Sequence, residues 1–390
     1  MLEAGRHPNI NLLAYSEVKS VTGKAGNFTV KVLKKARYVD EKECTSCGKC
    51  VEKCPKKVPN EFELGLDKRK AIYLYFPQGI PAVVTIDTEN CIYFATGKCK
   101  VCEKFCEKKA IDFEQKDETI TLHPGAIIVA TGFDMYDPTH LSQYGYGKYK
   151  NVITSLEYER LICAFGPKKG ELLRPSDEKH AEVIGYIQCV GSRSLKDNRF
   201  CSSVCCMHAT KEAMLAREHN PRAQSTIFYT DFRAFGKGFQ KYIKRGEEEY
   251  GIKYIRSRVA EITEDEEQNP VIWYEDTKSR MVKSKKVDLV VLATALVPRK
   301  DVSGLAKVLG VELDEYKFFK TDPFTPTDTT KSGIFAAGYC QAPLDIPECV
   351  AQASAAAQRA ANVVLLERKQ SGQLRSQETP ARTQSDTTSS

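Results

Sequence analysis

The stretch GAIIVATGFD (residues 125–134) is a short apolar run that ends in a glycine turn. Two later stretches repeat the pattern, VDLVVLATAL (residues 287–296) and GIFAAGYC (residues 333–340). Short apolar runs of this kind, bounded by small residues, are typical of strands buried inside a parallel sheet. The three stretches therefore predict that distant parts of the chain contribute strands to buried sheets.

Between these strands the sequence carries helical patterns. After a fourth buried strand at 183–187 (VIGYI), residues 209–219 and 238–251 have amphipathic periodicity, and the second of these segments ends in Gly. A long Ala-rich helix is predicted from Pro347 onward, because Pro is favoured at the start of a helix. Strands that alternate with helices predict an α/β fold with parallel sheets.

Composition excludes several classes of protein. The chain has 390 residues, a hydrophobic content of 42% and a net charge of +7 without a long basic run, so no nucleic-acid surface is predicted. No run approaches about 18 apolar residues, and the first residues lack a signal-peptide core. We therefore expect a cytoplasmic protein without a membrane partner. The 15 cysteines are clustered, which favours metal binding over disulfides.

The clearest cysteine motif is CTSCGKCVEKCP (residues 44–55), the spacing of bacterial ferredoxins. In that pattern three thiolates bind one [4Fe-4S] cluster and the fourth binds a neighbouring cluster, so a second run is expected. It is CIYFATGKCKVCEKFC (residues 91–106), with a first gap of seven residues. Paired zinc knuckles are the alternative. The expected ligand sets are Cys44, Cys47, Cys50 and Cys106 for one cluster, and Cys54, Cys91, Cys99 and Cys102 for the other.

The three apolar stretches resemble two-dinucleotide-binding-domain flavoproteins of the thioredoxin reductase-like group. In that group an Ala-Thr-Gly turn closes the FAD domain, a late strand contacts the ribityl chain, and the next helix N-terminus points at the isoalloxazine. The alternative is that these are ordinary strand-end turns. The resemblance implies FAD-binding positions at Thr131, Gly132, Gly338, Tyr339, Cys340, Ile346, Pro347 and Glu348.

The glycine loop that seats a dinucleotide pyrophosphate, Gly-x-Gly-x-x-Gly, is missing from the sequence. We therefore expect Met1 to begin partway through an FAD domain. The strand at 183–187 leads instead into a further group of cysteines, in QCVGSR (188–193) and CSSVCC (201–206). A vicinal disulfide or buried structural thiols are alternatives to a third [4Fe-4S] cluster, which we favour. Its expected ligands are Cys189, Cys201, Cys205 and Cys206.

In combination, these segments resemble HdrA, the flavin and iron–sulfur subunit of heterodisulfide reductase from methanogenic and related archaea. The resemblance extends over most of residues 7–362 and includes RYVDEKECTSCGKCVEKCP, YIQCVGSRS, CSSVCCMHATKEA and DIPECVAQASAAA. It implies an oxidoreductase subunit whose FAD bifurcates electron pairs, and it places Lys211 near the flavin. The implied partners are other heterodisulfide reductase subunits, a ferredoxin and a hydrogenase- or dehydrogenase-type donor, in an oligomer. The C-terminal ferredoxin module of the family is replaced here by a polar tail.

The predicted organisation is a thioredoxin reductase-like fold with an inserted α+β ferredoxin domain. Two other functions remain open: a flavin-free relay of clusters, or a split or fragment subunit that needs a partner chain for FAD. An independent NAD(P)H reductase is disfavoured by the missing glycine loops, and no catalytic side chain is predicted. Cys163 and Cys349 are expected to be packing residues. The predicted boundaries are 1–37, 113–157 and 287–366 for the FAD domain, 38–112 for the insert, 158–286 for the domain with the third cysteine group, and 367–390 for a disordered tail.

Overall fold

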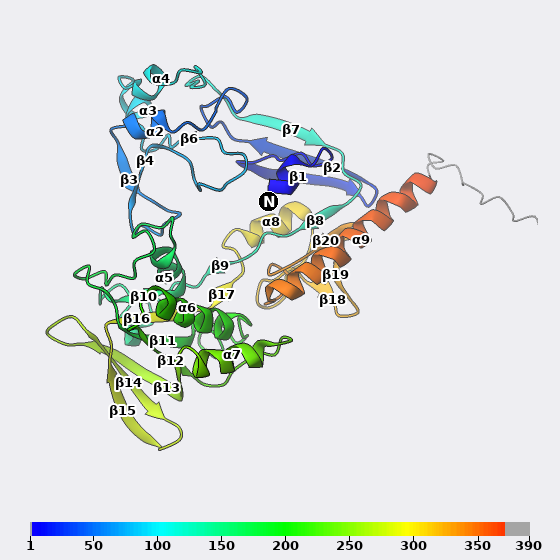
Figure 1. Cartoon of the computed structure of the whole chain (residues 1–390). Helices are drawn as coiled ribbons and strands as arrows, with labels where there is room; N and C mark the ends of the chain where they lie inside the picture. Colours follow the sequence, from blue (N-terminus) through cyan, green and yellow to red (C-terminus); the bar gives the residue numbers. More distant parts are fainter. Residues whose placement is uncertain (1, 371–390) are drawn as a thin grey trace, which may run out of the picture.

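The computed structural model describes residues 2–370, and in it the apolar run at 287–296 forms an inner strand of a seven-stranded sheet (Figure 1). All six residues of this strand, β16 (Leu289–Thr294), are buried. It runs parallel to β10 (Val152–Thr154) on one side and to β11 (Val183–Val190) on the other. A strand covered on both faces needs apolar side chains at successive positions, and the sequence LVVLA supplies them.

The rest of this sheet follows the predicted alternation of strands and helices. Its parallel part continues into a hairpin of antiparallel strands at one edge, and the helices pack against the parallel part. The helical patterns at 209–219 and 238–251 are both found as helices, so the prediction of an α/β fold is confirmed. The remaining elements are β12 (Gln224–Tyr229), β13 (Lys253–Glu264), β14 (Pro270–Asp276), β15 (Met281–Lys286), α5 (Ser155–Ile162), α6 (Cys205–His219) and α7 (Phe239–Glu248).

A second part of the molecule contains the other two apolar runs. Strand β8 (Ile127–Val129) lies parallel to β20 (Ile334–Ala336), in register from Ile127 to Val129. A three-stranded antiparallel sheet and helix α8 share one buried cluster with these strands, and Phe28 is one of its fully buried members. The other elements here are β1 (Ser16–Lys24), β2 (Asn27–Lys34), β7 (Glu118–Leu122), β18 (Thr321–Asp322), β19 (Thr325–Thr329), α8 (Val302–Leu309) and α1 (Leu2–Arg6).

Helix α9 (Ile346–Gln370) follows β20 and extends away from the sheets, drawn in orange in Figure 1. Its backbone continues four residues into the segment from 367 onward that was predicted to be a disordered tail. The rest of that segment, from residue 371, lies outside the described residues.

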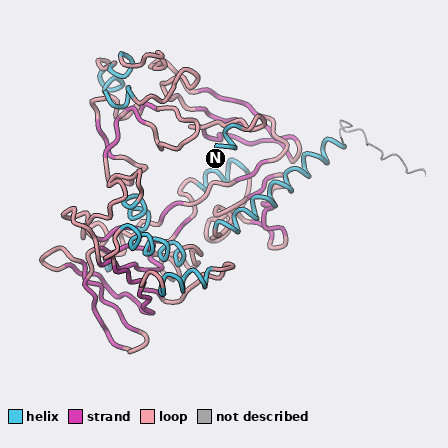
Figure 2. Tube along the Cα trace, in the orientation of Figure 1, coloured by secondary structure: helices cyan, strands magenta, loops and turns pink. Residues whose placement is uncertain are grey.

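The cysteine-rich insert forms a module of its own with a buried cluster that extends from Val39 to Phe113. Figure 2 shows only short helices and strands in it, connected by loops. An ion pair attaches it to the seven-stranded part: Nε and Nη2 of Arg160 donate to the carboxylate of Glu63, at 2.8 and 2.7 Å. Its elements are α2 (Lys49–Lys53), α3 (Ile92–Thr96), α4 (Val101–Lys104), β3 (Lys57–Pro59), β4 (Lys68–Lys70), β5 (Ile72–Tyr73) and β6 (Thr85–Ile86).

The seven-stranded part and the β8/β20 part are connected by a short antiparallel pair, β9 (Asp134–Met135) with β17 (Leu296–Val297). Strands β10 and β16 lie in the seven-stranded sheet, although the predicted boundaries at 157/158 and 286/287 assign them to the neighbouring domain. An apolar run identifies a buried strand but not the sheet that it joins, which explains the difference.

A 3₁₀ turn, η1 (Ser142–Tyr144), precedes β10. Among the described helices, none combines the length and the apolar character needed to cross a bilayer.

Candidate iron–sulfur sites

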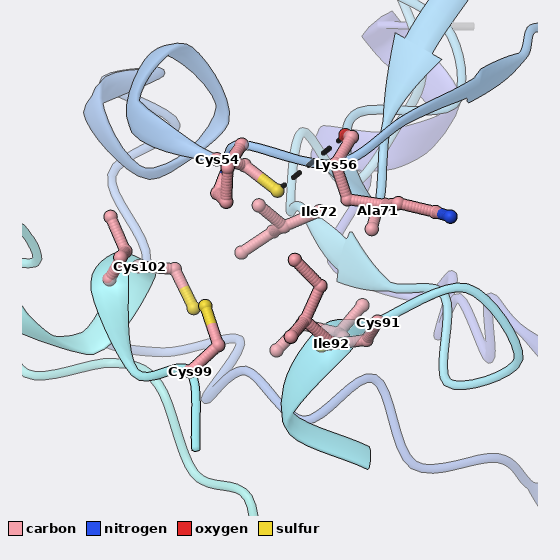
Figure 3. A pocket seen from close by; sticks show the side chains of 11 residues that line it. Cys54, Lys56, Ala71, Ile72, Cys91, Ile92, Cys99 and Cys102 are labelled. Carbon is pink, nitrogen blue, oxygen red and sulfur yellow. Dashed lines mark hydrogen bonds between the residues drawn. The ribbon is translucent and has the colours of Figure 1, made fainter. Parts of the chain in front are cut away.

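One of the predicted ligand sets lines a common cavity in the cysteine-rich module (Figure 3). Cys54 comes from the end of the first motif and the other three members, Cys91, Cys99 and Cys102, come from the second. In Figure 3 the sulfurs of Cys99 and Cys102 point toward each other, whereas the sulfur of Cys54 is directed at the carbonyl of Lys56, 3.8 Å away. The remaining wall is apolar and includes Ile72, Ile86 and Ile92. Four thiols at an apolar cavity are the donor set that a [4Fe-4S] cluster requires.

The other predicted set in this module surrounds Cys50, which lies on helix α2. Burial raises the pKa of the Cys50 thiol to about 11, and the nearby Cys106 is the largest of the cysteine contributions that raise it further. Cys44 and Cys47, from the same motif, contribute in the same sense. The structure therefore brings Cys106 from the second motif to the three leading cysteines of the first.

The backbone of the first motif allows this convergence because two of its residues have left-handed conformations. Ser46 has φ 53° and Gly48 has φ 78°. Gly48 immediately precedes helix α2, and no heavy atom lies within 4 Å of the position of a Cβ there. Glycine takes this left-handed conformation without steric cost, and the turn leads directly into the helix that carries Cys50.

The raised thiol pKa values make a prediction about assembly. Burial raises the pKa of Cys102 to about 12, so at neutral pH this thiol of the metal-free protein carries its proton. Iron binds the thiolate, so each ligand must release its proton when the cluster is inserted. We therefore expect reconstitution with ferrous iron and sulfide under anaerobic conditions to be more complete at pH 9 than at pH 7. Iron retained after desalting is the measurement, and equal or lower incorporation at pH 9 would contradict the expectation.

The third cysteine group lies where the seven-stranded sheet meets the start of helix α6. Cys189 is on β11, one residue before that strand ends, and takes φ 61°. Cys205 and Cys206 are the first two residues of α6, and the thiol of Cys205 donates to the carbonyl of Thr294 at the end of β16, at 3.9 Å. Cys201 precedes the helix. The carboxyl ends of parallel strands and a helix N-terminus form the place where α/β proteins bind anionic groups.

The four thiols of this group influence one another. Burial raises the pKa of Cys206 to about 12, and the nearby Cys189, Cys205 and Cys201 raise it further. Thr294, whose carbonyl accepts from Cys205, has a buried hydroxyl oxygen without a hydrogen-bond partner among the described residues. Four free thiols next to an unpartnered buried hydroxyl fit a bound group with several acceptor atoms, such as the sulfides of a cluster.

Within residues 2–370, no three His, Cys, Asp or Glu side chains are grouped so that they could hold a single metal ion. A four-iron cluster does not require that grouping, because each of its irons binds one thiolate.

The predicted flavin-binding turns lie next to each other at the carboxyl ends of β8 and β20. Cys340 is near Thr131 and Gly132, and its buried thiol donates to the carbonyl of Val129 at 3.4 Å. Thr131 is exposed, whereas Gly338 takes φ 79° and faces Cys349. The side chain of Cys340 is therefore used inside the fold, whereas Thr131 is open to a ligand.

Tyr339 is also turned inward, toward the third cysteine group. Its hydroxyl donates to the carbonyl of Ser202 at 3.1 Å and lies 3.3 Å from the carbonyl of Leu296. Its ring is 5% exposed and packs edge-on against Phe133. Tyr339 thus connects the turn at Gly338 to the segment that holds Cys201. Its sequence position predicted a contact with a ribityl chain, but its side chain has a structural role here.

The N-terminus of helix α9, predicted to point at a flavin, is capped by its own residues. The carboxylate of Asp345 accepts the backbone N–H of Glu348 at 2.9 Å, and the carboxylate of Glu348 accepts the N–H of Asp345 at 2.8 Å. Ile346 and Pro347 are exposed at the first turn. The spacing Asp-x-x-Glu is a signature of this reciprocal cap, and sequence reasoning could have found it. Lys211, the other predicted flavin contact, lies on α6 and is exposed.

Comparison with known proteins agrees with these features. Residues 37–59 match the 4Fe-4S binding domain family. The iron–sulfur HdrA subunit of the CoB–CoM heterodisulfide reductase of Methanocaldococcus jannaschii is 48% identical over 361 residues, which cover 92% of this chain and 54% of that protein. One of two such subunits of Methanopyrus kandleri is 50% identical over 93% of this chain and 55% of its own length. The corresponding subunit of the H2:CoB–CoM heterodisulfide, ferredoxin reductase of Methanothermobacter marburgensis is 45% identical over 93% of this chain and 54% of its own length.

Two thioredoxin reductases are among the similar solved structures. That of Lactococcus lactis has a TM-score of 0.40 and 21% identity, and the alignment covers 76% of this chain and 86% of the reductase. That of T. acidophilum has a TM-score of 0.41 and 18% identity, over 77% and 85%. The chain spans about half the length of the curated relatives that it matches. Over that half, the chain is a homologue of the HdrA subunit of heterodisulfide reductase.

Proposed function

We propose that this chain is an electron-transfer subunit of a heterodisulfide reductase-type oxidoreductase, with three [4Fe-4S] clusters. The observation that carries the proposal is the cavity shared by Cys54, Cys91, Cys99 and Cys102. Thiols from two motifs, separated by more than thirty residues, line one apolar space. Structural cysteines have no reason to meet in this way, whereas cluster ligands do.

The proximity of the two sets in the module supports electron transfer between their clusters. Cys50 of one set is close enough to Cys102 of the other to raise its pKa, after the larger effect of burial. Clusters held by these thiols would exchange single electrons over a short distance. The third group, Cys189 with Cys201, Cys205 and Cys206, adds a further cluster in place of a nucleotide loop. A role in bifurcation, with ferredoxin and other subunits as partners, is proposed from the homologues' names.

We also propose that this chain contributes part of an FAD-binding site. The turn at Thr131, which is exposed, and Gly132, which is half-buried, would hold the flavin end of the cofactor. A bound flavin would take up electrons in pairs and pass them singly to the clusters. The sequence contains no glycine loop for the pyrophosphate end. The alternative function, a flavin-free relay of clusters, is supported by the inward side chains of Tyr339 and Cys340.

Anaerobic purification followed by iron, sulfide and flavin analysis tests the proposal. We expect about twelve irons per chain, because each of three clusters carries four. Bound FAD in addition supports the flavin-containing function, and the same iron content without FAD supports the relay. About eight irons would contradict a cluster at Cys189. Stoichiometric zinc in place of iron would contradict the proposed function as a whole.

A further inference from the structure

Three thiols of the third cysteine group accept hydrogen bonds from N–H groups. The backbone N–H of Ser203 donates to Cys201 at 3.4 Å, and that of Arg233 donates to Cys206 at 3.5 Å. The third donor differs in kind, because it is a side chain with a full positive charge: Nη1 of Arg193 lies 4.0 Å from Sγ of Cys189. Arg193 is therefore a charged group in direct contact with the sulfur of Cys189, and His208, which is paired with Glu212, lies near Cys205 of the same set.

Arg193 is held in place from both ends. Its backbone N–H donates to the carbonyl of Phe200 at 3.0 Å, which closes the loop between β11 and the later cysteines. The same Nη1 that faces Cys189 also forms an ion pair with Asp231. Asp231 in turn lies 3.5 Å from Nε of Arg233, whose backbone reaches Cys206. The guanidinium is mostly buried, with 22% of the side chain exposed, whereas Asp231 is 42% exposed.

We propose that Arg193 raises the reduction potential of the cluster held by the third cysteine group and that Asp231 orients Arg193 and partly offsets its charge. The proposal rests on the presence of that cluster in the proposed function. When bound, a four-iron cluster takes up one electron and one unit of negative charge, with no bond broken and no proton transferred. A fixed positive charge at Cys189 stabilises the more negative, reduced form. The carboxylate of Asp231 acts in the opposite sense because it is near the same site.

Substitution of these two residues gives shifts of opposite sign. Arg193→Gln removes the positive charge, so we expect the potential to fall. Asp231→Asn removes the negative charge but keeps an oxygen that accepts a hydrogen bond from Arg193, so we expect the potential to rise. A unit charge this close, partly screened by solvent, is worth roughly a tenfold change in the ratio of reduced to oxidised cluster, or about 59 mV. Arg193→Lys keeps the positive charge but lacks the planar guanidinium group. We therefore expect its reduction potential to lie between those of the wild type and Arg193→Gln.

The experiment is a potentiometric titration of the full chain with dithionite as the reductant, monitored by electron paramagnetic resonance. The component followed is the one that disappears in Cys206→Ser, which identifies the third cluster. Arg222→Gln is the matched control, because Arg222 forms an exposed ion pair with Glu182 beyond the far end of α6 and should leave the potential unchanged. Iron content is measured for every variant.

Opposite shifts in Arg193→Gln and Asp231→Asn, with the iron content retained, support the proposal. No shift, or shifts in the same direction, overturns it. If Arg193→Gln loses iron, the test rests on Asp231→Asn. A higher reduction potential in that variant supports the proposal, and an unchanged or lower potential overturns it. A wild-type chain with about eight irons has no third cluster, and that result refutes the proposed function rather than the assignment of Arg193.

Discussion

Cys102→Ser is expected to remove about four of about twelve irons and one of the cluster signals. Cys102 lies on helix α4, is 9% exposed and faces the cavity shared with Cys54. Serine is a poor ligand for iron, and the hydroxyl would be left in an apolar wall. Because the cluster also fills the middle of a module with little regular secondary structure, its loss should lower the thermal stability of that module. Iron analysis and anaerobic resonance spectra measure the first effect, and a thermal melt measures the second.

The same experiment tests how the two motifs exchange their last cysteine. Cys54→Ser should remove the same spectral component as Cys102→Ser, although Cys54 belongs to the first motif. Cys106→Ser should remove the other component, together with Cys50→Ser. Cys163→Ser is the control, since this cysteine ends helix α5 and lies outside the three sets. If Cys54→Ser instead removed the component that is lost in Cys50→Ser, the crossed arrangement would be wrong.

The cysteine sets could be predicted from sequence because cluster ligation fixes their spacing. The run Cys44-x-x-Cys47-x-x-Cys50 allows few loop shapes, and its fourth cysteine requires a distant partner motif. The buried strand β16 could be predicted for a similar reason, because its first five buried positions, Leu289 to Ala293, are all apolar. In both cases the physical constraint acts on residues that are close together in the chain.

Features that depend on contacts between distant segments could not be predicted. Asp231 is 38 residues from Arg193 in the sequence, and only the parallel pairing of β11 with β12 brings their two loops together. The inward turn of Tyr339 depends on the carbonyl of Ser202, 137 residues away. A position in a motif therefore indicated where the chain turns at Gly338, but it did not indicate which way the next side chain points.

Gly191→Ala is expected to disrupt the third cysteine group without changing a cysteine. Gly191 follows β11 and has φ 77°, a conformation that costs an L-residue about 1–2 kcal/mol. A Cβ there would also lie far inside contact distance of the Tyr136 ring. That ring cannot easily move, because its hydroxyl donates to Asp197 at 2.6 Å. Overpacking adds about 1–3 kcal/mol, so we expect the free energy of unfolding to fall by about 2–5 kcal/mol in total.

The displaced loop is the one that carries Cys189 and Arg193, so iron should fall by about four per chain while the ferredoxin-type module keeps its own. Gly251→Ala is the matched control. Gly251 has a similar φ of 67°, but no heavy atom lies within 4 Å of the new Cβ. The substitution should therefore lower the free energy of unfolding only through the unfavourable backbone conformation, and the iron should be retained. Tyr136→Ala combined with Gly191→Ala should recover part of the lost iron, because the clash is removed. Equal iron in Gly191→Ala and Gly251→Ala would show that the contact with Tyr136 does not support the cluster loop.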